Sequence, residues 1–153
     1  MLNFVRALSM KQVASWWHKD GEKILCTLCP KACRLGDGQR GFCHLRYREG
    51  ETLYTDGYGT TSGIAIDPIE KKPLNHFLPG TKILSLGNVG CNLACRFCQN
   101  WSISKASKTP LTLISSQELA QLAKDHGTPS VAFTYNDPTI WAEFIIEIGR
   151  AHV

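Results

Sequence analysis

Apolar residues near the start of the chain recur with the spacing of an amphipathic helix, and this pattern predicts a helix over residues 8–19. Ser9 would be its N-cap, Gln12 would be the capping-box partner, and Gly21 would end it. The apolar face of this helix would consist of Val13, Trp16 and Trp17. We expect that face to pack against the segment that follows.

The second half of the chain alternates between strand and helix patterns. Residues 82–86 predict an apolar strand, a helix capped by Ser115 and closed by Gly127 follows, and residues 130–134 predict a second apolar strand. A further helix would begin after Asp137, which can cap it, with proline at its first position. Strand, helix and strand in this order predict a βαβ unit with parallel strands and a right-handed crossover.

Between these regions the sequence predicts short strands and a proline-rich connector. Residues 51–59 and 64–66 alternate enough to predict strands, and three prolines in residues 67–80 exclude a long helix there. The connector carries three basic side chains, those of Lys71, Lys72 and His76. They either form a pocket for an anionic group or lie in solvent on a charged connector.

The composition indicates a globular chain with an unusual number of cysteines. Of its 153 residues, 43% are hydrophobic, which is enough for one domain with a core. No apolar run approaches the roughly 20 residues of a membrane span, and the first eight residues are too few for a secretory signal. The seven cysteines fall into groups of four and three, which favours metal ligation in a reducing cytoplasm over a disulfide framework. The net charge of +4 is mild and the basic residues are scattered, so no nucleic-acid-binding stripe is evident.

The most informative segment is the loop after the first apolar strand of the βαβ unit. It contains Cys91, Cys95 and Cys98, separated by three and then two residues, so one turn of backbone can direct three sulfurs to one point. Zinc sites and ferredoxin-type clusters both use four protein ligands. Three crowded thiolates therefore suggest a four-iron cluster with one iron open to a small molecule. The alternatives are a zinc knuckle completed by His76 or His126, and buried thiols that pack as small hydrophobes.

A second group of cysteines lies earlier in the chain, with the pattern C-x2-C-P-x2-C-x9-C. Its members are Cys26, Cys29, Cys33 and Cys43. Proline and glycine keep this segment in tight loops, and four thiols among so few hydrophobic residues need a metal to hold them in place. Zinc and an auxiliary four-iron cluster both satisfy the count of four, and the spacing does not choose between them. His44 could replace one ligand, although a surface histidine is the simpler interpretation.

The C-x3-C-x2-C spacing, with Phe97 just before the last cysteine, resembles the cluster loop of the radical S-adenosylmethionine (SAM) enzymes. The resemblance implies a [4Fe-4S] cluster whose open iron is chelated by the amino and carboxylate groups of SAM. In these enzymes a Gly-Gly-Glu-Pro-like segment binds the SAM amino group, and residues 134–138 resemble a variant of it without the glycine pair and with aspartate in place of glutamate. The cofactor contacts implied by the resemblance are Phe97, Tyr135, Asn136 and Asp137.

Further motifs narrow the resemblance. They are Glu-Lys-Lys-Pro-Leu at 70–74, His-Phe-Leu-Pro-Gly at 76–80, Gly-Cys-Asn-Leu at 90–93 and Phe-Cys-Gln-Asn-Trp at 97–101. Together with the first cysteine pattern they resemble the pyruvate formate-lyase activating enzyme-like proteins, in particular the radical SAM member of the AmmeMemoRadiSam system. The similarity covers nearly all of residues 26–144.

The resemblance implies an α/β fold, the N-terminal part of a radical SAM partial (β/α)6 TIM-like barrel, preceded by a small Cys-rich metal-binding segment. We expect an N-terminal helix in residues 1–22, the Cys-rich segment with short strands in 23–80, and the start of the barrel in 81–153. Because a complete barrel of this kind has six strand–helix units, we expect the chain to be an N-terminal fragment of the enzyme.

The implied reaction begins with an electron from a donor such as flavodoxin or ferredoxin. SAM is then cleaved to methionine and a 5′-deoxyadenosyl radical, which abstracts hydrogen from a substrate that could be a glycine in a partner protein. Two other classes of function remain open. A binding module with two zinc sites would contain zinc and no iron, and an iron–sulfur electron-transfer protein would not respond to SAM. The count of three cysteines in the later group argues against both, because each prefers a fourth.

Overall fold

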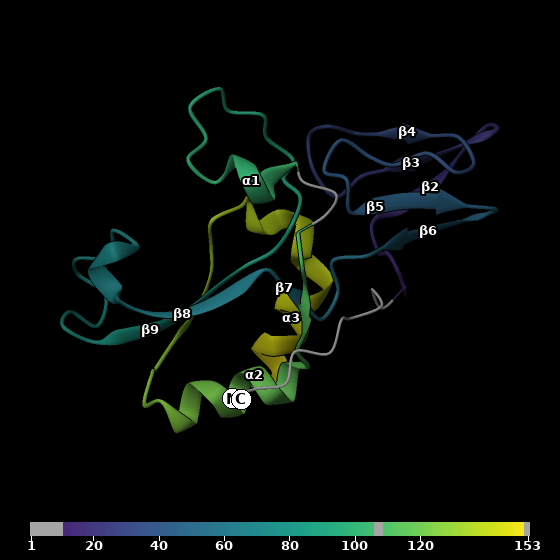
Figure 1. Ribbon diagram of the computed structural model, residues 1–153. Coiled ribbons are helices and arrows are strands. Elements are labelled where there is room, and N and C mark those ends of the chain that lie inside the picture. The colour runs from purple at the N-terminus through teal and green to yellow at the C-terminus, as the bar shows by residue number, and fades with distance from the viewer. Residues whose placement is uncertain (1–10, 106–108, 152–153) are drawn as a thin grey trace.

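The computed structural model describes residues 11–105 and 109–151. Figure 1 shows the N-terminal strands, in purple and blue, beside a region in which helices and a sheet pack together. The N-terminal strands form antiparallel sheets with the orders β1-β6-β5 and β2-β3-β4. Their bounds are β1 Gln12–Val13, β2 Trp17–Asp20, β3 Lys23–Cys26, β4 Arg34–Leu35, β5 Arg46–Glu49 and β6 Thr52–Thr55.

The helix predicted over residues 8–19 is wrong in its described part, where β1 and β2 lie instead. Its proposed cap, Ser9, is outside the described residues. β2 pairs with β3 in a hairpin whose loop contains Gly21, and the φ of Gly21 is +60°, a conformation that glycine adopts at little cost. Trp16, between β1 and β2, also has a positive φ, +55°, which interrupts any helix.

The sheet of the second region has the order β11-β9-β8. β9 and β11 are parallel, which confirms the pairing expected of the βαβ unit, and β8 is antiparallel to β9. A short antiparallel pair, β7 with β10, lies beside this sheet. The bounds are β7 Thr60–Thr61, β8 Gly63–Pro68, β9 Lys82–Gly87, β10 Thr112–Leu113 and β11 Val131–Phe133. The strands predicted at 64–66, 82–86 and 130–134 are confirmed.

The helix capped by Ser115 begins where the sequence signals placed it, and the one predicted after Asp137 begins there as a 3₁₀ turn, whereas the short helix at 101–104 was not predicted. Their bounds are α1 Trp101–Ser104, α2 Ser116–Asp125 and α3 Ala142–Ala151, with 3₁₀ turns η1 Ile69–Lys71 and η2 Pro138–Trp141. The predicted capping box of α2 is present: Glu118 N donates to Ser115 Oγ (3.1 Å), and Ser115 N donates to Glu118 Oε2 (2.8 Å). Asp137 caps η2, which leads directly into α3.

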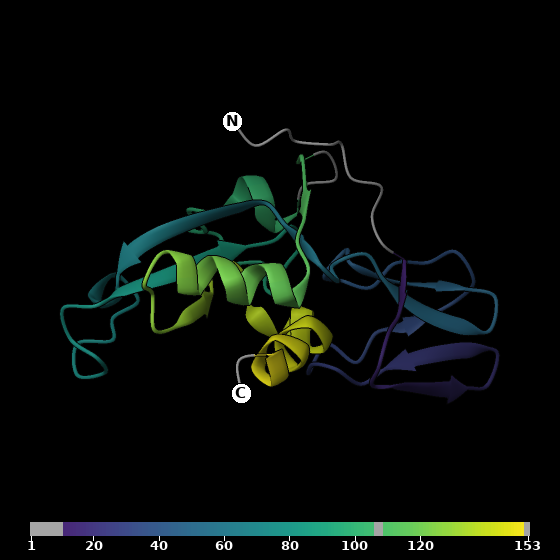
Figure 2. The ribbon, with the colours of Figure 1, turned by 90° about the horizontal axis from the view of Figure 1, so that it is seen from below.

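α2 and α3 pack together against the sheet, as Figure 2 shows. Their shared apolar core consists of Leu84, Leu86, Leu119, Ala120, Ala123, Trp141, Phe144 and Ile148. Phe133 of β11 meets Trp141 and Phe144 edge to face, at centroid distances of 5.6 and 6.3 Å. This core fixes the adjacent strands β9 and β11, from whose ends the functional loops leave.

A buried ion pair connects the N-terminal sheets to α3. The guanidinium of Arg46, on β5, is almost completely buried and pairs with Glu143. Glu143 also accepts a hydrogen bond from the backbone N–H of Ser15 (2.8 Å), and Arg46 donates to the Ser15 carbonyl (2.7 Å). The two regions are therefore joined through charged groups as well as along the chain.

The described residues form a mixed α/β fold with more strands than helices, and they show no closed barrel. The partial barrel and the domain boundaries stay predictions. Over residues 11–105 and 109–151, no helix has the length and apolar character needed to cross a membrane.

Candidate functional site

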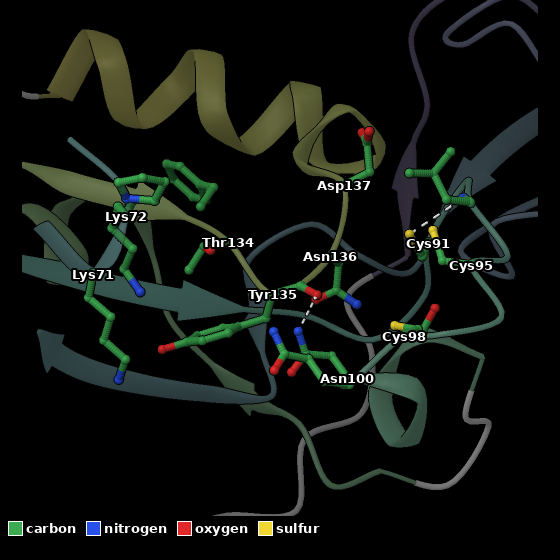
Figure 3. A pocket seen from close by; sticks show the side chains of 16 residues that line it. Lys71, Lys72, Cys91, Cys95, Cys98, Asn100, Thr134, Tyr135, Asn136 and Asp137 are labelled. Carbon is green, nitrogen blue, oxygen red and sulfur yellow. Dashed lines mark hydrogen bonds between the residues drawn. The ribbon is translucent and has the colours of Figure 1, made fainter. Parts of the chain in front are cut away.

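Two strand ends and the proline-rich connector surround a pocket of about 740 Å³ (Figure 3). Because β9 and β11 are parallel and adjacent, the loops that follow them leave from the same edge of the sheet, where α/β folds bind ligands. The lining comes from residues 71–73 and 132–137 and from part of the segment between them, namely Cys91, Leu93, Cys95, Cys98, Gln99, Asn100 and Ser104. Cysteines lie on one side of the pocket and lysines on the other.

The cysteines of the predicted cluster all line this pocket. Cys91 is buried, Cys98 is half-buried and Cys95 is exposed. The backbone N–H of Leu93 donates to Cys91 Sγ (3.4 Å), and Cys98 N donates to the carbonyl of Cys95 (3.2 Å). Among the described residues, no three His, Cys, Asp or Glu side chains are close enough together to hold a metal ion. The thiols are therefore gathered around one pocket but do not stand at ligand distance.

The histidines considered for a zinc knuckle do not reach this pocket. His126 instead lines a separate groove along β8, and His76 is not among the residues that line the cysteine pocket. The structure thus offers no fourth ligand from either histidine.

Phe97 does not line the pocket, although the resemblance implied a cofactor contact there. Its side chain is 90% exposed, and the nearby Trp101 is 74% exposed. Both aromatic rings are presented to solvent beside the cysteine loop.

Tyr135 lies where the chain turns after β11, with a φ of +70°. Strained non-glycine residues of this kind gather at ligand sites. Its hydroxyl donates to Asp67 Oδ2 (3.2 Å), and its carbonyl accepts a hydrogen bond from Asn100 Nδ2 (3.0 Å). Its ring covers Gly87, where a Cβ would stand 2.7 Å from the ring. Contacts from three segments therefore hold Tyr135 in place.

Asn136 and Asp137 also line the pocket, and both side chains make hydrogen bonds within the protein. Asn136 Nδ2 donates to the Gly90 carbonyl (2.7 Å), and its Oδ1 accepts from Asn88 N (3.2 Å). Asn136 thereby fastens the loop after β11 to the loop after β9. Asp137 Oδ1 accepts from Thr139 N (2.9 Å), so capping uses one carboxylate oxygen and leaves the other for a ligand.

Lys71 and Lys72, which the sequence analysis considered as part of a pocket for an anionic group, line the opposite wall, and both pair with Asp67, which the sequence analysis did not single out. Asp67, on β8, is 6% exposed and accepts hydrogen bonds from Lys71 Nζ (2.8 Å) and Lys72 Nζ (2.7 Å). These two ammonium groups hold the pKa of Asp67 well below its usual range, against the opposing effect of burial. Two lysines face one carboxylate, so this wall has a surplus positive charge, whereas His76 is not part of it. The four-residue spacing of Asp67 and Lys71 is the sequence feature from which their ion pair could have been predicted.

The loop with Cys91 rests on the loop with Cys43. Lys105 Nζ donates to the carbonyls of Cys91 (2.5 Å) and Phe42 (2.9 Å) and lies 3.9 Å from the centroid of the Phe42 ring. Burial lowers the pKa of Lys105, and the neighbouring thiols oppose that shift. Gly90 has a φ of +91°, and a Cβ there would clash with the Cys43 carbonyl oxygen. Only glycine fits this contact.

The earlier cysteines surround a second, much smaller cavity. All four of them line it, namely Cys26, Cys29, Cys33 and Cys43. Burial raises the pKa of Cys26, while a backbone N–H of Leu28 opposes the shift. His44 is exposed and does not line this cavity. The structure therefore places the predicted ligands of the second group around one cavity, without His44, although not at ligand distance from one point.

Comparison with known proteins agrees with the cysteine pocket. Residues 87–153 match the family model of the Radical SAM superfamily. The chain is also similar to an uncharacterized protein of Methanocaldococcus jannaschii, with 39% identity over 140 residues that cover 90% of this chain and 42% of that protein. The chain thus spans less than half the length of this curated relative. No solved structure matches the chain. The superfamily match supports radical SAM chemistry in general, and it does not reach the narrower activating-enzyme-like family.

Proposed function

We propose that this protein is a radical SAM enzyme whose [4Fe-4S] cluster is held by Cys91, Cys95 and Cys98. The observation that supports this most is that these thiols and residues 135–137 line one pocket at the carboxyl ends of two parallel strands. The superfamily match includes the same residues. When bound, the cluster would supply one electron to SAM, which gives methionine and a 5′-deoxyadenosyl radical able to abstract hydrogen from a substrate.

The pocket fits these groups in chemistry and in size. Thiolates are the usual protein ligands of iron–sulfur clusters, and the N–H of Leu93 donates to Cys91 Sγ in the way that stabilises a thiolate. A volume of about 740 Å³ is typical of pockets for small molecules. The side chains of Cys95 and Cys98 would turn inward when the cluster binds, since the three thiols do not stand at ligand distance from one point.

The proposed roles of the strand-end residues follow from their hydrogen bonds. The free carboxylate oxygen of Asp137 and the backbone at Tyr135 are the groups we assign to the SAM amino group. Asn136 holds the two loops in register through its bonds to Gly90 and Asn88. Lys71 and Lys72 form a pocket wall, called here the lysine wall, with a surplus positive charge over Asp67. This charge favours the binding of an anionic group, either the SAM carboxylate or a part of the substrate.

The finer proposal is an activating-enzyme-like role, as in the AmmeMemoRadiSam system, with a glycine of a partner protein as the substrate and flavodoxin or ferredoxin as the electron donor. The motifs at 70–80 and 90–101 support it by resemblance. Large apolar side chains exposed beside the pocket are also typical of contact with a protein; they are Leu93, Phe97 and Trp101.

The test is SAM cleavage by the complete protein. We expect the anaerobically reconstituted, reduced protein to form 5′-deoxyadenosine, and we expect Cys98→Ser to abolish it because one cluster ligand is lost. His44→Ala, at an exposed residue outside both cysteine cavities, is the control and should keep the activity. A protein that binds the cluster but releases no 5′-deoxyadenosine would be an electron carrier, and one that contains zinc without iron would be a binding module.

A further inference from the structure

The four earlier cysteines line one small cavity from two loops, and their thiols, like the later three, would move inward to reach ligand distance from one ion. Cys26 ends β3, Cys29 and Cys33 lie in the connection to β4, and Cys43 precedes β5. Backbone hydrogen bonds fix this frame: Cys26 N donates to the Cys33 carbonyl (2.9 Å), and Gly41 N donates to the Arg46 carbonyl (2.8 Å). The cavity is thus a consequence of the hairpin geometry.

Backbone N–H groups already point to two of the four sulfurs of this cavity. Phe42 N donates to Cys33 Sγ (3.4 Å), and the N–H of Leu28 points to the Cys26 thiol. Hydrogen bonds of this kind favour the charged form of a ligand. The sulfurs of Cys26 and Cys33 therefore already accept hydrogen bonds from backbone groups whose positions the fold fixes.

Arg46 supplies a second, independent indication. Its side chain lines the cavity and is buried, and its Nε is a buried donor without a hydrogen-bond partner among the described residues. An unsatisfied buried N–H is costly, and a thiolate next to it would remove that cost. Lys31 also lines the cavity. Four thiolates around a divalent ion have a net charge of −2, which Lys31 would offset in part, because the charge of Arg46 is already balanced by Glu143.

The size of the cavity distinguishes between the two metals that the cysteine count allows. The cavity among the four thiols has a volume of only about 10 Å³. That is room for roughly one water molecule. A single ion would enter this space with small movements of the thiols, whereas a cube of four irons and four sulfides would need the surrounding loops to move apart. We propose that Cys26, Cys29, Cys33 and Cys43 form a closed tetrahedral site for one zinc ion.

This site has a role beyond its own loop. Cys43 belongs to the segment whose backbone touches Gly90, next to the candidate cluster ligand Cys91. Lys105 bonds the same two segments together through the carbonyls of Phe42 and Cys91. Zinc at Cys43 would therefore position the loop that carries Cys91. The zinc assignment does not rest on the proposed radical chemistry.

The test uses the complete protein with Cys91, Cys95 and Cys98 all replaced by serine, which removes the candidate cluster ligands. Elemental analysis should find one zinc ion per chain, and Cys29→Ser added to this variant should lose it. Iron with sulfide retained in the triple variant would overturn the zinc assignment in favour of an auxiliary cluster, and absence of any metal would overturn the site.

Two further measurements do not depend on how Cys29→Ser folds. Cobalt(II) exchanged into the triple variant should give the strong visible absorption of a tetrahedral four-thiolate site, and a pale octahedral spectrum would contradict the proposal. Removal of the zinc by a chelator should speed hydrogen exchange at the Gly90 amide, which donates to the Ile103 carbonyl (2.9 Å). Unchanged exchange there would overturn the positioning role.

Discussion

Gly90 is the residue at which the two cysteine-bearing segments touch. We predict that Gly90→Ala destabilises the protein by about 3 kcal/mol, because a side chain at positive φ is strained and its Cβ meets the Cys43 carbonyl, which cannot move easily. Urea unfolding of both proteins measures this difference in the free energy of unfolding.

Gly63→Ala is the matched control for this substitution. Gly63 lies on β8, has no positive φ, and no atom lies within 4 Å of a Cβ placed there. We expect a change of about 0.5 kcal/mol or less. Equal effects of the two substitutions would mean that the contact between Gly90 and Cys43 does not stabilise the fold.

The charge cluster at Asp67 gives a pH-dependent prediction. Its pKa in the folded state lies below its usual value, so the stability it contributes is fully present above about pH 4 and is lost as the pH falls further. At pH 7 we expect Asp67→Asn to lower the free energy of unfolding by about 2 kcal/mol, because the largely buried Lys72 loses its carboxylate partner.

The difference between wild type and Asp67→Asn should shrink toward pH 3, and urea unfolding at the two pH values measures it. Asp20→Asn removes an exposed pair with Arg34 and should have little effect at either pH. A difference for Asp67→Asn that stays constant with pH would contradict the role of its charge.

Spacing along the sequence predicted the three cysteines, and the family resemblance implied the strand-end residues; both groups lie on short loops next to clear strands and line one pocket. Spacing could not reveal that Asn136 bonds to Gly90 or that Lys105 bonds to Phe42. These partners are separated by tens of residues, and only the folded chain brings them together.

Among the elements, α2 has the clearest local signals, and its N-terminus can be tested directly. Ser115→Ala removes the acceptor of the Glu118 N–H, and we expect a loss of about 1 kcal/mol in the free energy of unfolding. Ser115→Asp keeps a capping acceptor and should restore most of that loss. Thermal unfolding followed by circular dichroism compares the three proteins, and equal stability of all three would contradict the capping role.

The first element shows where periodicity misleads. Val13, Trp16 and Trp17 have helical spacing, but they fall in two short strands separated by the positive φ of Trp16. Asp20 and Gly21 formed a hairpin signal that competed with the helix pattern. In strands this short, pairing with β3 and β6 decides the structure, and those partners are not visible in a local window.

At the scale of the whole molecule, the pair of Arg46 and Glu143 joins the N-terminal sheets to α3. We predict that Glu143→Gln lowers the free energy of unfolding by about 3 kcal/mol, because a buried guanidinium loses its counter-charge. Glu49→Gln breaks an exposed pair with Lys11 and should cost about 0.5 kcal/mol or less. Similar urea midpoints for the two variants would show that the buried pair does not hold the regions together.

The α/β character and the parallel strand pair could be predicted for the molecule as a whole, because helix caps and apolar strands are local signals. The N-terminal sheets could not be predicted from the sequence, because the two-residue strands β1 and β4 are too short to show a hydrophobic pattern. The candidate site followed from three cysteines, whereas its lysine wall depends on β8 lying beside β9.

The most direct test of the central claim is electron paramagnetic resonance of the reduced, reconstituted protein with and without SAM. The account predicts a [4Fe-4S] signal that changes when SAM is added, and loss of the signal in Cys98→Ser, because SAM must bind the iron that has no cysteine. A four-iron signal of the complete protein that is identical with and without SAM would contradict an open iron at Cys91, Cys95 and Cys98.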